Sequence, residues 1–197
     1  MKKVFYTLIA LSLSIKAAMA MESTAKYENY LNGIKTLAGD FTQISNKGHR
    51  AQGKIQISRP GKMRLAYTPP SYLLIVADGK WLITKDRQAD EVNYVSLENT
   101  PAAFILRPRV RFSGDVAITS VVPIDNNTTE ISLIRREDPD AGYITLIFQD
   151  NPIELKGWRV TDPQGETQVV LSNMQANIQL PGGLFHIESP NLFQQIF

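Results

Sequence analysis

Apolar and polar residues alternate with a period of two along most of the chain after residue 38. Turn formers such as Asn46-Lys47-Gly48, Pro60-Gly61 and Asp78-Gly79 separate these runs at short intervals. The alternation predicts short strands with one apolar face, joined by tight turns into an antiparallel meander. About eleven such strands can be placed, in the segments GDFTQIS, QGKIQIS, KMRLAY, YLLIVA, KWLITK, EVNYV, AITSVV, TEISLI, YITLIF, LKGWRV and TQVVLSN.

Two segments depart from this period and predict helices. Over residues 23–37 the apolar positions follow helical spacing, at Tyr27, Tyr30, Leu31, Ile34 and Leu37. A shorter helix is predicted over residues 100–106, where Thr100 would cap the start and Pro101 would take the first helical position.

The two helices are little cover for the apolar face of so large a sheet. Pattern alone favours the simpler interpretation, in which they cap an ordinary filled core. The alternative is a helical lid over an apolar cavity, because a sheet curled around too little filling leaves room for a ligand.

The first twenty residues are typical of a cleaved secretory signal. Lys2 and Lys3 precede an apolar run too short to span a bilayer, and a small-x-small pattern ends at Ala20. We expect residues 1–20 to be removed and residues 21–197 to form one domain. The chain has no cysteine, so we expect neither a disulfide nor a lipid anchor. A soluble periplasmic protein is therefore predicted.

Charge and composition argue against several functions. Of the 21 Lys and Arg, the leader holds three and no acidic residue, which leaves 18 basic against 19 acidic residues. We therefore expect no nucleic-acid partner, since phosphate binding needs a clustered positive face. His49 and His186 are the only histidines, and the run Glu137-Asp138-Pro139-Asp140 lacks the alternation of a calcium loop. We expect no catalysis, no cofactor and no metal site.

The segment ISRPGKMRLAY, residues 57–67, places Arg59 at a tight corner between two strands. By itself this pattern favours an arginine that faces solvent at a turn. The alternation puts five apolar residues on one face of the two strands: Ile55, Ile57, Met63, Leu65 and Tyr67.

The order of several motifs resembles the periplasmic outer-membrane lipoprotein carrier family, LolA. These motifs are Phe41-x-Gln43, Arg59-Pro60-Gly61-Lys62-Met63-Arg64, Ile75-Val76-x-Asp78-Gly79, Thr100-Pro101, and Gly157-Trp158 followed by Val160-x-Asp162. The resemblance extends over nearly the whole chain after the leader. It implies an incomplete, strongly curved antiparallel β-barrel with a helical lid over an apolar cavity.

The resemblance also implies a function and a site. The family carries triacylated lipoproteins from an inner-membrane lipoprotein-releasing ABC transporter to an outer-membrane lipoprotein receptor, without a cofactor, and we expect a monomer. Arg59 falls on the functional arginine of the family and would latch the Pro101 helix over the empty cavity. A guanidinium has five donors and no acceptor, so carbonyls near this helix would satisfy it. The expected acyl-chain cavity is lined by Ile55, Ile57, Met63, Leu65, Tyr67, Phe104 and Leu106.

Two alternatives remain open at the level of sequence. The same half-barrel could carry other lipids, or it could be a lipoprotein-sensing interaction module, although such sensors usually have a second domain. Met63 and Leu65 stand where relatives commonly have aromatic residues, which predicts a more adaptable wall. Residues 191–197 form an apolar tail that we expect to pack on the outer face or near the mouth.

Overall fold

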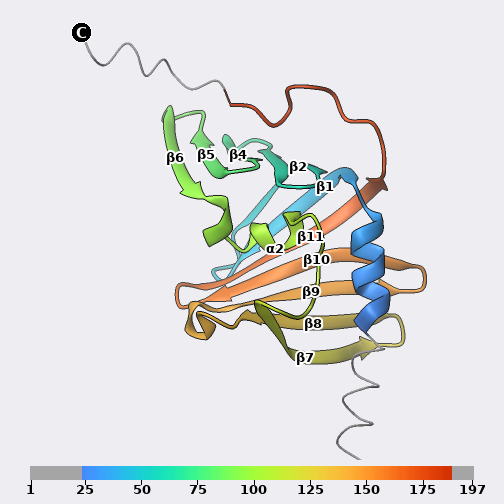
Figure 1. The fold of residues 1–197 in the computed structure, drawn as a ribbon. Coiled ribbons are helices and arrows are strands. Elements are labelled where there is room, and N and C mark those ends of the chain that lie inside the picture. Colours follow the sequence, from blue (N-terminus) through green and yellow to red (C-terminus); the bar gives the residue numbers. More distant parts are fainter. Residues whose placement is uncertain (1–23, 188–197) are drawn as a thin grey trace, which may run out of the picture.

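The computed structural model describes residues 24–187 of the chain. The predicted leader over residues 1–20 and the apolar tail over residues 191–197 lie outside the described residues. All eleven strands of this described part belong to one antiparallel sheet (Figure 1), which confirms the predicted fold class. The strands are β1 (Thr36–Ser45), β2 (Arg50–Ser58), β3 (Lys62–Tyr67), β4 (Leu73–Asp78), β5 (Trp81–Asp86), β6 (Glu91–Ser96), β7 (Val116–Asp125), β8 (Thr128–Arg135), β9 (Tyr143–Asp150), β10 (Ile153–Asp162) and β11 (Gly165–Ala176).

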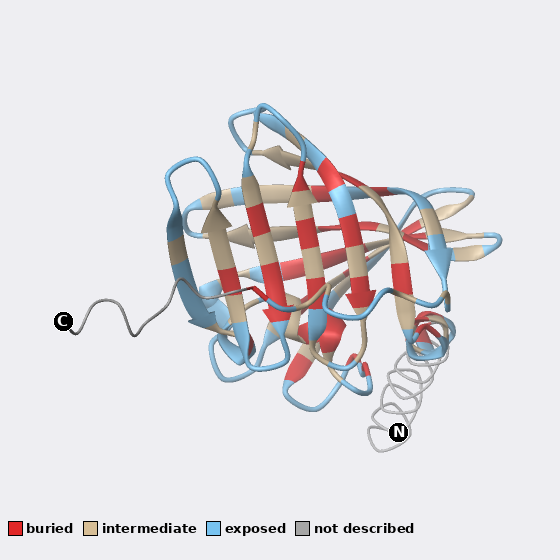
Figure 2. Ribbon diagram, turned by 90° about the horizontal axis from the view of Figure 1, so that it is seen from above, coloured by how far each residue is buried: buried red, intermediate tan, exposed pale blue. Residues whose placement is uncertain are grey.

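The strand order is β6-β5-β4-β3-β2-β1-β11-β10-β9-β8-β7. Each neighbouring pair follows the chain except the central one, in which β1 pairs with β11. Strands β6 and β7 stand at the two ends of this order, and no pairing joins them within residues 24–187. The sheet is therefore a curled but incomplete barrel, open along the side between β6 and β7 (Figures 1 and 2).

The concave face of the sheet carries the main hydrophobic core. Buried residues alternate with more exposed ones along the strands (Figure 2), as the period of two predicts. Phe41 of β1, Ile55 of β2, and Leu146 and Phe148 of β9 are at most 1% exposed and belong to one cluster. The aromatic rings of Phe41 and Tyr67 meet edge to face, with 4.9 Å between ring centres.

The N-terminal helix is shorter than the sequence predicted. Residues 24–33 are helical, and β1 begins at Thr36, so Leu37 lies on a strand rather than on the helix. The helix ends at Gly33, which is a poor helix former. Leu37 instead pairs with Ile57 on β2 and Ala176 on β11, and this tertiary pairing outweighs the helical spacing of the sequence.

The connection between β6 and β7 holds two short helical elements, η1 (Leu97–Asn99) and α2 (Ala102–Leu106). A third short element, η2 (Pro139–Ala141), lies between β8 and β9. Helix α2 confirms the predicted second helix, but its start differs in detail. Pro101 takes the cap position, while the Thr100 hydroxyl donates a hydrogen bond to the Leu97 carbonyl instead of capping α2.

A smaller apolar cluster lies on the convex face. Leu74, Val76 and Ile83 from β4 and β5 pack against Ile187 and Phe185. The Arg64 guanidinium also donates a hydrogen bond to the Leu184 carbonyl, at 3.2 Å. The segment after β11 is thus fastened across the back of β3, β4 and β5, and the concave face is left to the helices.

We predict that Phe41→Ala lowers the free energy of unfolding by about 3–5 kcal/mol, because it empties the centre of the concave core. Denaturant unfolding followed by circular dichroism measures this change. Val170→Ala serves as the control, since Val170 is 38% exposed on the same sheet, and we expect it to cost less than about 1 kcal/mol. Equal losses in the two variants would contradict a core centred on Phe41.

Candidate functional site

The open side of the barrel is covered by the connection between β6 and β7, which runs through η1, α2 and residues 107–115 (Figure 1). Its apolar side chains point into the concave core. Phe104, Leu106, Val110 and Phe112 are at most 5% exposed, and the rings of Phe104 and Phe112 stack with 6.1 Å between their centres. The connection therefore closes the cup with an apolar inner surface.

Two cavities flank α2. One of about 300 Å³ lies toward the ends of β8, β9 and β10, and its apolar lining includes Phe104, Val116, Leu133, Ile144 and Val160. The other, of about 600 Å³, lies toward the turns after β2 and β4 and is lined by residues that include Pro60, Gly61, Gly79, Leu97 and Leu106. Glu98, Ala103 and Arg107 line both cavities. Helix α2 therefore lies between the two cavities.

The guanidinium of Arg59, at the end of β2, binds both helical parts of the closure. Its Nε and Nη2 donate to the Arg107 carbonyl just after α2, at 3.2 and 2.9 Å. Its Nη1 donates to the carbonyls of Leu31 and Ile34 at the end of helix 24–33, the latter at 3.3 Å, and Nη2 lies 3.5 Å from the Asn32 side-chain oxygen. A cation is favourable at the C-terminal end of a helix, where carbonyls lack partners.

Burial lowers the pKa of Arg59 from its ordinary value. The guanidinium nevertheless keeps its charge, because an arginine is not deprotonated in proteins. The half-buried Arg59 is held by backbone carbonyls and the Asn32 side chain, and no carboxylate is among its hydrogen-bond partners in the described residues. Water can therefore replace these hydrogen bonds once the closure moves.

The turn after Arg59 adds a second hold on α2. The Gly61 amide donates a hydrogen bond of 2.8 Å to the Leu106 carbonyl. Gly61 has a φ of +78°, and a Cβ at this position would lie 2.8 Å from the Gly79 Cα. Glycine is therefore required here by both the backbone conformation and the close approach of the neighbouring turn.

Helix 24–33 holds the segment that follows α2. The side chain of Asn32 donates to the Val110 carbonyl at 2.9 Å and accepts from the Val110 amide at 2.8 Å. One turn earlier, the Glu28 carboxylate accepts from the Phe112 amide at 2.7 Å. The backbone of Val110 and Phe112 is not part of the sheet, and these bonds give its polar groups their partners. Helix 24–33 and the segment after α2 therefore form one unit.

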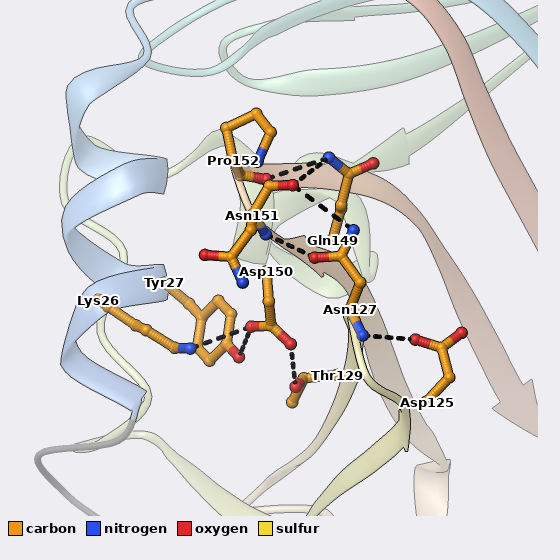
Figure 3. Close-up of polar contacts among 9 residues, drawn as sticks. All are labelled: Lys26, Tyr27, Asp125, Asn127, Thr129, Gln149, Asp150, Asn151 and Pro152. Atoms are coloured by element: carbon orange, nitrogen blue, oxygen red, sulfur yellow. Dashed lines mark hydrogen bonds and ion pairs between the residues drawn. The ribbon is translucent and has the colours of Figure 1, made fainter.

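The other end of helix 24–33 is fastened to Asp150 at the end of β9 (Figure 3). Its carboxylate accepts hydrogen bonds from Tyr27, from Lys26 at 3.0 Å and from Thr129 at 2.8 Å. The side chain of Asp150 is 15% exposed. Burial alone would raise its pKa, but the hydrogen bonds from Tyr27, Lys26 and Thr129 outweigh burial and lower the pKa of Asp150 below its ordinary value.

The model of the family described as "Outer membrane lipoprotein carrier protein LolA" matches residues 32–188. This chain belongs to the LolA family. An outer-membrane lipoprotein carrier protein of Chromobacterium violaceum is 30% identical over 93% of this chain and 92% of its own length. That of Cupriavidus necator is 32% identical over 90% of this chain and 89% of its own length.

A crystal structure of a DUF1329 family protein from Desulfovibrio piger is similar in fold to this LolA-family chain. It has a TM-score of 0.50 with 8% sequence identity, and the likeness covers 85% of this chain and 96% of the other. At this identity the likeness concerns the fold alone, and it agrees with the incomplete barrel described above.

The site residues that the LolA resemblance suggested are placed as follows. Ile55, Ile57, Met63, Leu65 and Tyr67 lie on the concave face, each at most 6% exposed, within the closed core. Phe104 and Pro101 line the smaller cavity, and Leu106 lines the larger. Arg59 contacts the carbonyl of Arg107 after the Pro101 helix rather than the start of that helix.

Sequence reasoning did not predict the roles of Glu28, Asn32 and Asp150. Their partners are remote along the chain, at separations of 84, 78 and 123 residues for Phe112, Val110 and Tyr27. No local motif marks such contacts. The spacing of Glu28 and Asn32 by one helical turn is the signal that they share a face of the helix.

The described residues contain no group of three His, Cys, Asp or Glu that could hold a metal ion. None of the helices within residues 24–187 is long and apolar enough to cross a bilayer.

We predict that Asp150→Asn destabilises the protein by about 1–3 kcal/mol at neutral pH, because the hydrogen bonds lose their charged acceptor. The folded pKa of Asp150 is lowered, so its stabilising effect is complete above the unfolded pKa of about 3.9 and is lost as the pH falls through the folded pKa. The difference in unfolding free energy between wild type and variant should therefore shrink below about pH 4.

Unfolding in denaturant at several pH values measures this difference. Asp138→Asn is the matched control, because Asp138 is exposed and makes no side-chain cap hydrogen bond. A difference that stays constant down to the most acidic pH would show that the charge of Asp150 does not hold the helix.

Proposed function

We propose that the protein binds the acyl chains of triacylated lipoproteins under α2 and carries them through the periplasm from the inner to the outer membrane. The observation that carries this proposal is the Arg59 guanidinium, which joins both helical parts of the closure over an apolar concave face. Membership of the LolA family, and relatives that are described as outer-membrane lipoprotein carrier proteins, support it.

The cost of moving lipid explains why such a carrier needs a closed cup. Exposure of acyl chains to water costs about 0.8 kcal/mol per methylene, so three chains of about 16 carbons cost roughly 35–40 kcal/mol. Only an enclosed apolar surface can offset this cost. The same surface must be covered when the carrier is empty, because large exposed apolar patches lead to aggregation.

The closed structure has too little space for this cargo. Its cavities of about 300 and 600 Å³ each fall within the range of pockets for a single drug-sized ligand. Binding of three long chains therefore requires α2 to move aside. Its displacement would merge the cavities and uncover Phe104, Leu106 and the concave-face residues Ile55, Ile57, Met63, Leu65 and Tyr67 as the acyl-chain wall.

Delivery then follows from the same contacts. An inner-membrane lipoprotein-releasing ABC transporter would supply the cargo, and an outer-membrane lipoprotein receptor would accept it from the monomeric carrier. When the cargo leaves, α2 closes and the bonds of Arg59 re-form. The free energy of closure thus favours release, because it stabilises the empty state and not the loaded one.

A release assay tests the function directly. Spheroplasts with radiolabelled lipoproteins are incubated with the purified protein, and the soluble fraction is analysed for acylated cargo. We expect triacylated lipoproteins in a one-to-one complex with the carrier. If no lipoprotein is released and mass spectrometry finds a fatty acid or glycolipid on the protein instead, the function moves to that lipid.

We predict that Arg59→Leu slows the transfer of bound lipoprotein to outer-membrane vesicles by at least about tenfold, because loss of 1.4 kcal/mol or more from the closed state changes the equilibrium by that factor. Uptake of cargo should persist, since opening becomes easier. Arg59→Lys should remain impaired, because an ammonium cannot form the fork of hydrogen bonds to two helices.

The control for this prediction is Arg50→Leu, at an exposed arginine that begins β2 and is remote from α2 along the strand. It should transfer cargo at the wild-type rate. Wild-type transfer by Arg59→Leu would exclude Arg59 as the latch.

A further inference from the structure

The segment after α2 presents two arginines on the outside of the closure. We call residues 107–114 the strap; it runs from α2 toward β7 (Figure 1). Its side chains alternate: Val110 and Phe112 are 0% and 4% exposed and point into the core, whereas Arg109 and Arg111 are exposed. Val110 and Phe112 therefore anchor the strap in the core, and Arg109 and Arg111 lie on its outer surface.

The strap is held in place although it is not part of the sheet. Asn32 makes two hydrogen bonds to the backbone of Val110, and Glu28 accepts one from the Phe112 amide. Arg111 lies between these two anchored positions. Arg109 lies between Val110 and the Arg107 carbonyl, which Arg59 holds two residues earlier. Their guanidinium groups therefore extend from a rigid support at the mouth of the cup.

The positive charge of these two arginines is only partly balanced nearby. No acidic residue occurs between Glu98 and Asp115. Asp115 is paired with Arg107 through two bonds of 3.0 Å. The Glu28 carboxylate accepts from the Phe112 amide beside Arg111, so the three arginines of the strap have two carboxylates next to them, and an excess of one positive charge is left. Among residues 24–187 no salt bridge involves Arg109 or Arg111.

The described chain as a whole is nearly neutral, with 18 basic and 17 acidic residues over residues 24–187. On a nearly neutral molecule, a local excess of positive charge turns the molecule in the electric field of a charged surface more than it pulls the whole molecule toward that surface. A negatively charged surface would thus meet the strap first.

We propose that the strap is a docking surface for an anionic phospholipid bilayer. Guanidinium groups bind phosphate oxygens in a two-pronged geometry. Docking at this place would turn α2 and the two cavities toward the membrane. The inference rests on the proposed function, in which a transporter and a receptor that sit at the two membranes exchange cargo with the space behind α2.

The chemistry of the strap fits a membrane surface better than a protein partner. Its exposed side chains are those of Pro108, Arg109, Arg111 and Ser113, and none is the aromatic or large apolar anchor that dominates the energy of protein interfaces. Attraction by charge alone is weak and is screened by salt. Weak attraction suits a carrier that must also leave the membrane.

Vesicle flotation with the purified protein tests the proposal. The protein is mixed with vesicles of phosphatidylcholine alone or of phosphatidylcholine with phosphatidylglycerol, at low and at high salt. We expect binding to the anionic vesicles only, and weaker binding at high salt. The double variant Arg109→Gln/Arg111→Gln should lose about 30-fold in affinity, from about 1 kcal/mol for each arginine near an anionic surface.

The matched control is Lys47→Gln/Arg50→Gln, which removes the same charge from exposed positions at the turn between β1 and β2. It should bind anionic vesicles like wild type. Absence of binding by wild type, or equal losses in the two double variants, would overturn the proposal. Wild-type vesicle affinity in the strap variant, together with lost cargo transfer, would also overturn it and indicate an acidic protein partner.

Binding of a triacylated lipopeptide in solution separates this inference from the proposed function. We expect the strap variant to bind the lipopeptide like wild type, and thermal unfolding to confirm that it is folded. If wild type binds anionic vesicles but no lipopeptide, the proposed function fails while the docking surface stands. If wild type binds the lipopeptide but not the vesicles, the docking surface alone fails.

Discussion

The concave apolar face of a sheet whose edges do not meet is the constraint on which this molecule is built. An open side between β6 and β7 would expose Phe41, Ile55 and their neighbours to water. The chain solves this locally, because the connection that must run from β6 to β7 crosses the gap and fills it with apolar side chains. Cover and connection are thus the same segment, and the barrel needs no further strand.

Helix 24–33 and the connection between β6 and β7 together cover the core, and both carry polar contacts that the core beneath does not have. Apolar packing holds the strands and the inner side of the cover alike. Helix 24–33 and the segment after α2 are held in addition by polar contacts at Arg59, Asn32 and Asp150. A hydrogen bond exchanged for one to water contributes little net free energy. The cover can therefore open without a large loss, provided that another apolar surface replaces it over the core.

Much of the fold could be predicted from the sequence, because period-two patterns with turn residues between them determine strands locally. The helical spacing predicts a helix over residues 23–37 that is too long at its end, since the pairing of Leu37 with Ile57 and Ala176 cannot be seen in local spacing. Arg59 by itself looked like a solvent-facing turn residue, and only the family resemblance pointed to the closure. Asp150 had no sequence signal at all, because its partners come from the first described helix and from another strand.

The pairing of β1 with β11 also determines how the molecule tolerates shortening. In a simple meander the first and last strands stand at the edges, and loss of either trims the sheet. Here they meet in the middle, where Leu37 lies opposite Ala176. A protease cut or an early stop codon before β11 would therefore divide the sheet into two halves rather than narrow it. Because that seam joins residues so far apart along the chain, it is also a slow contact to form.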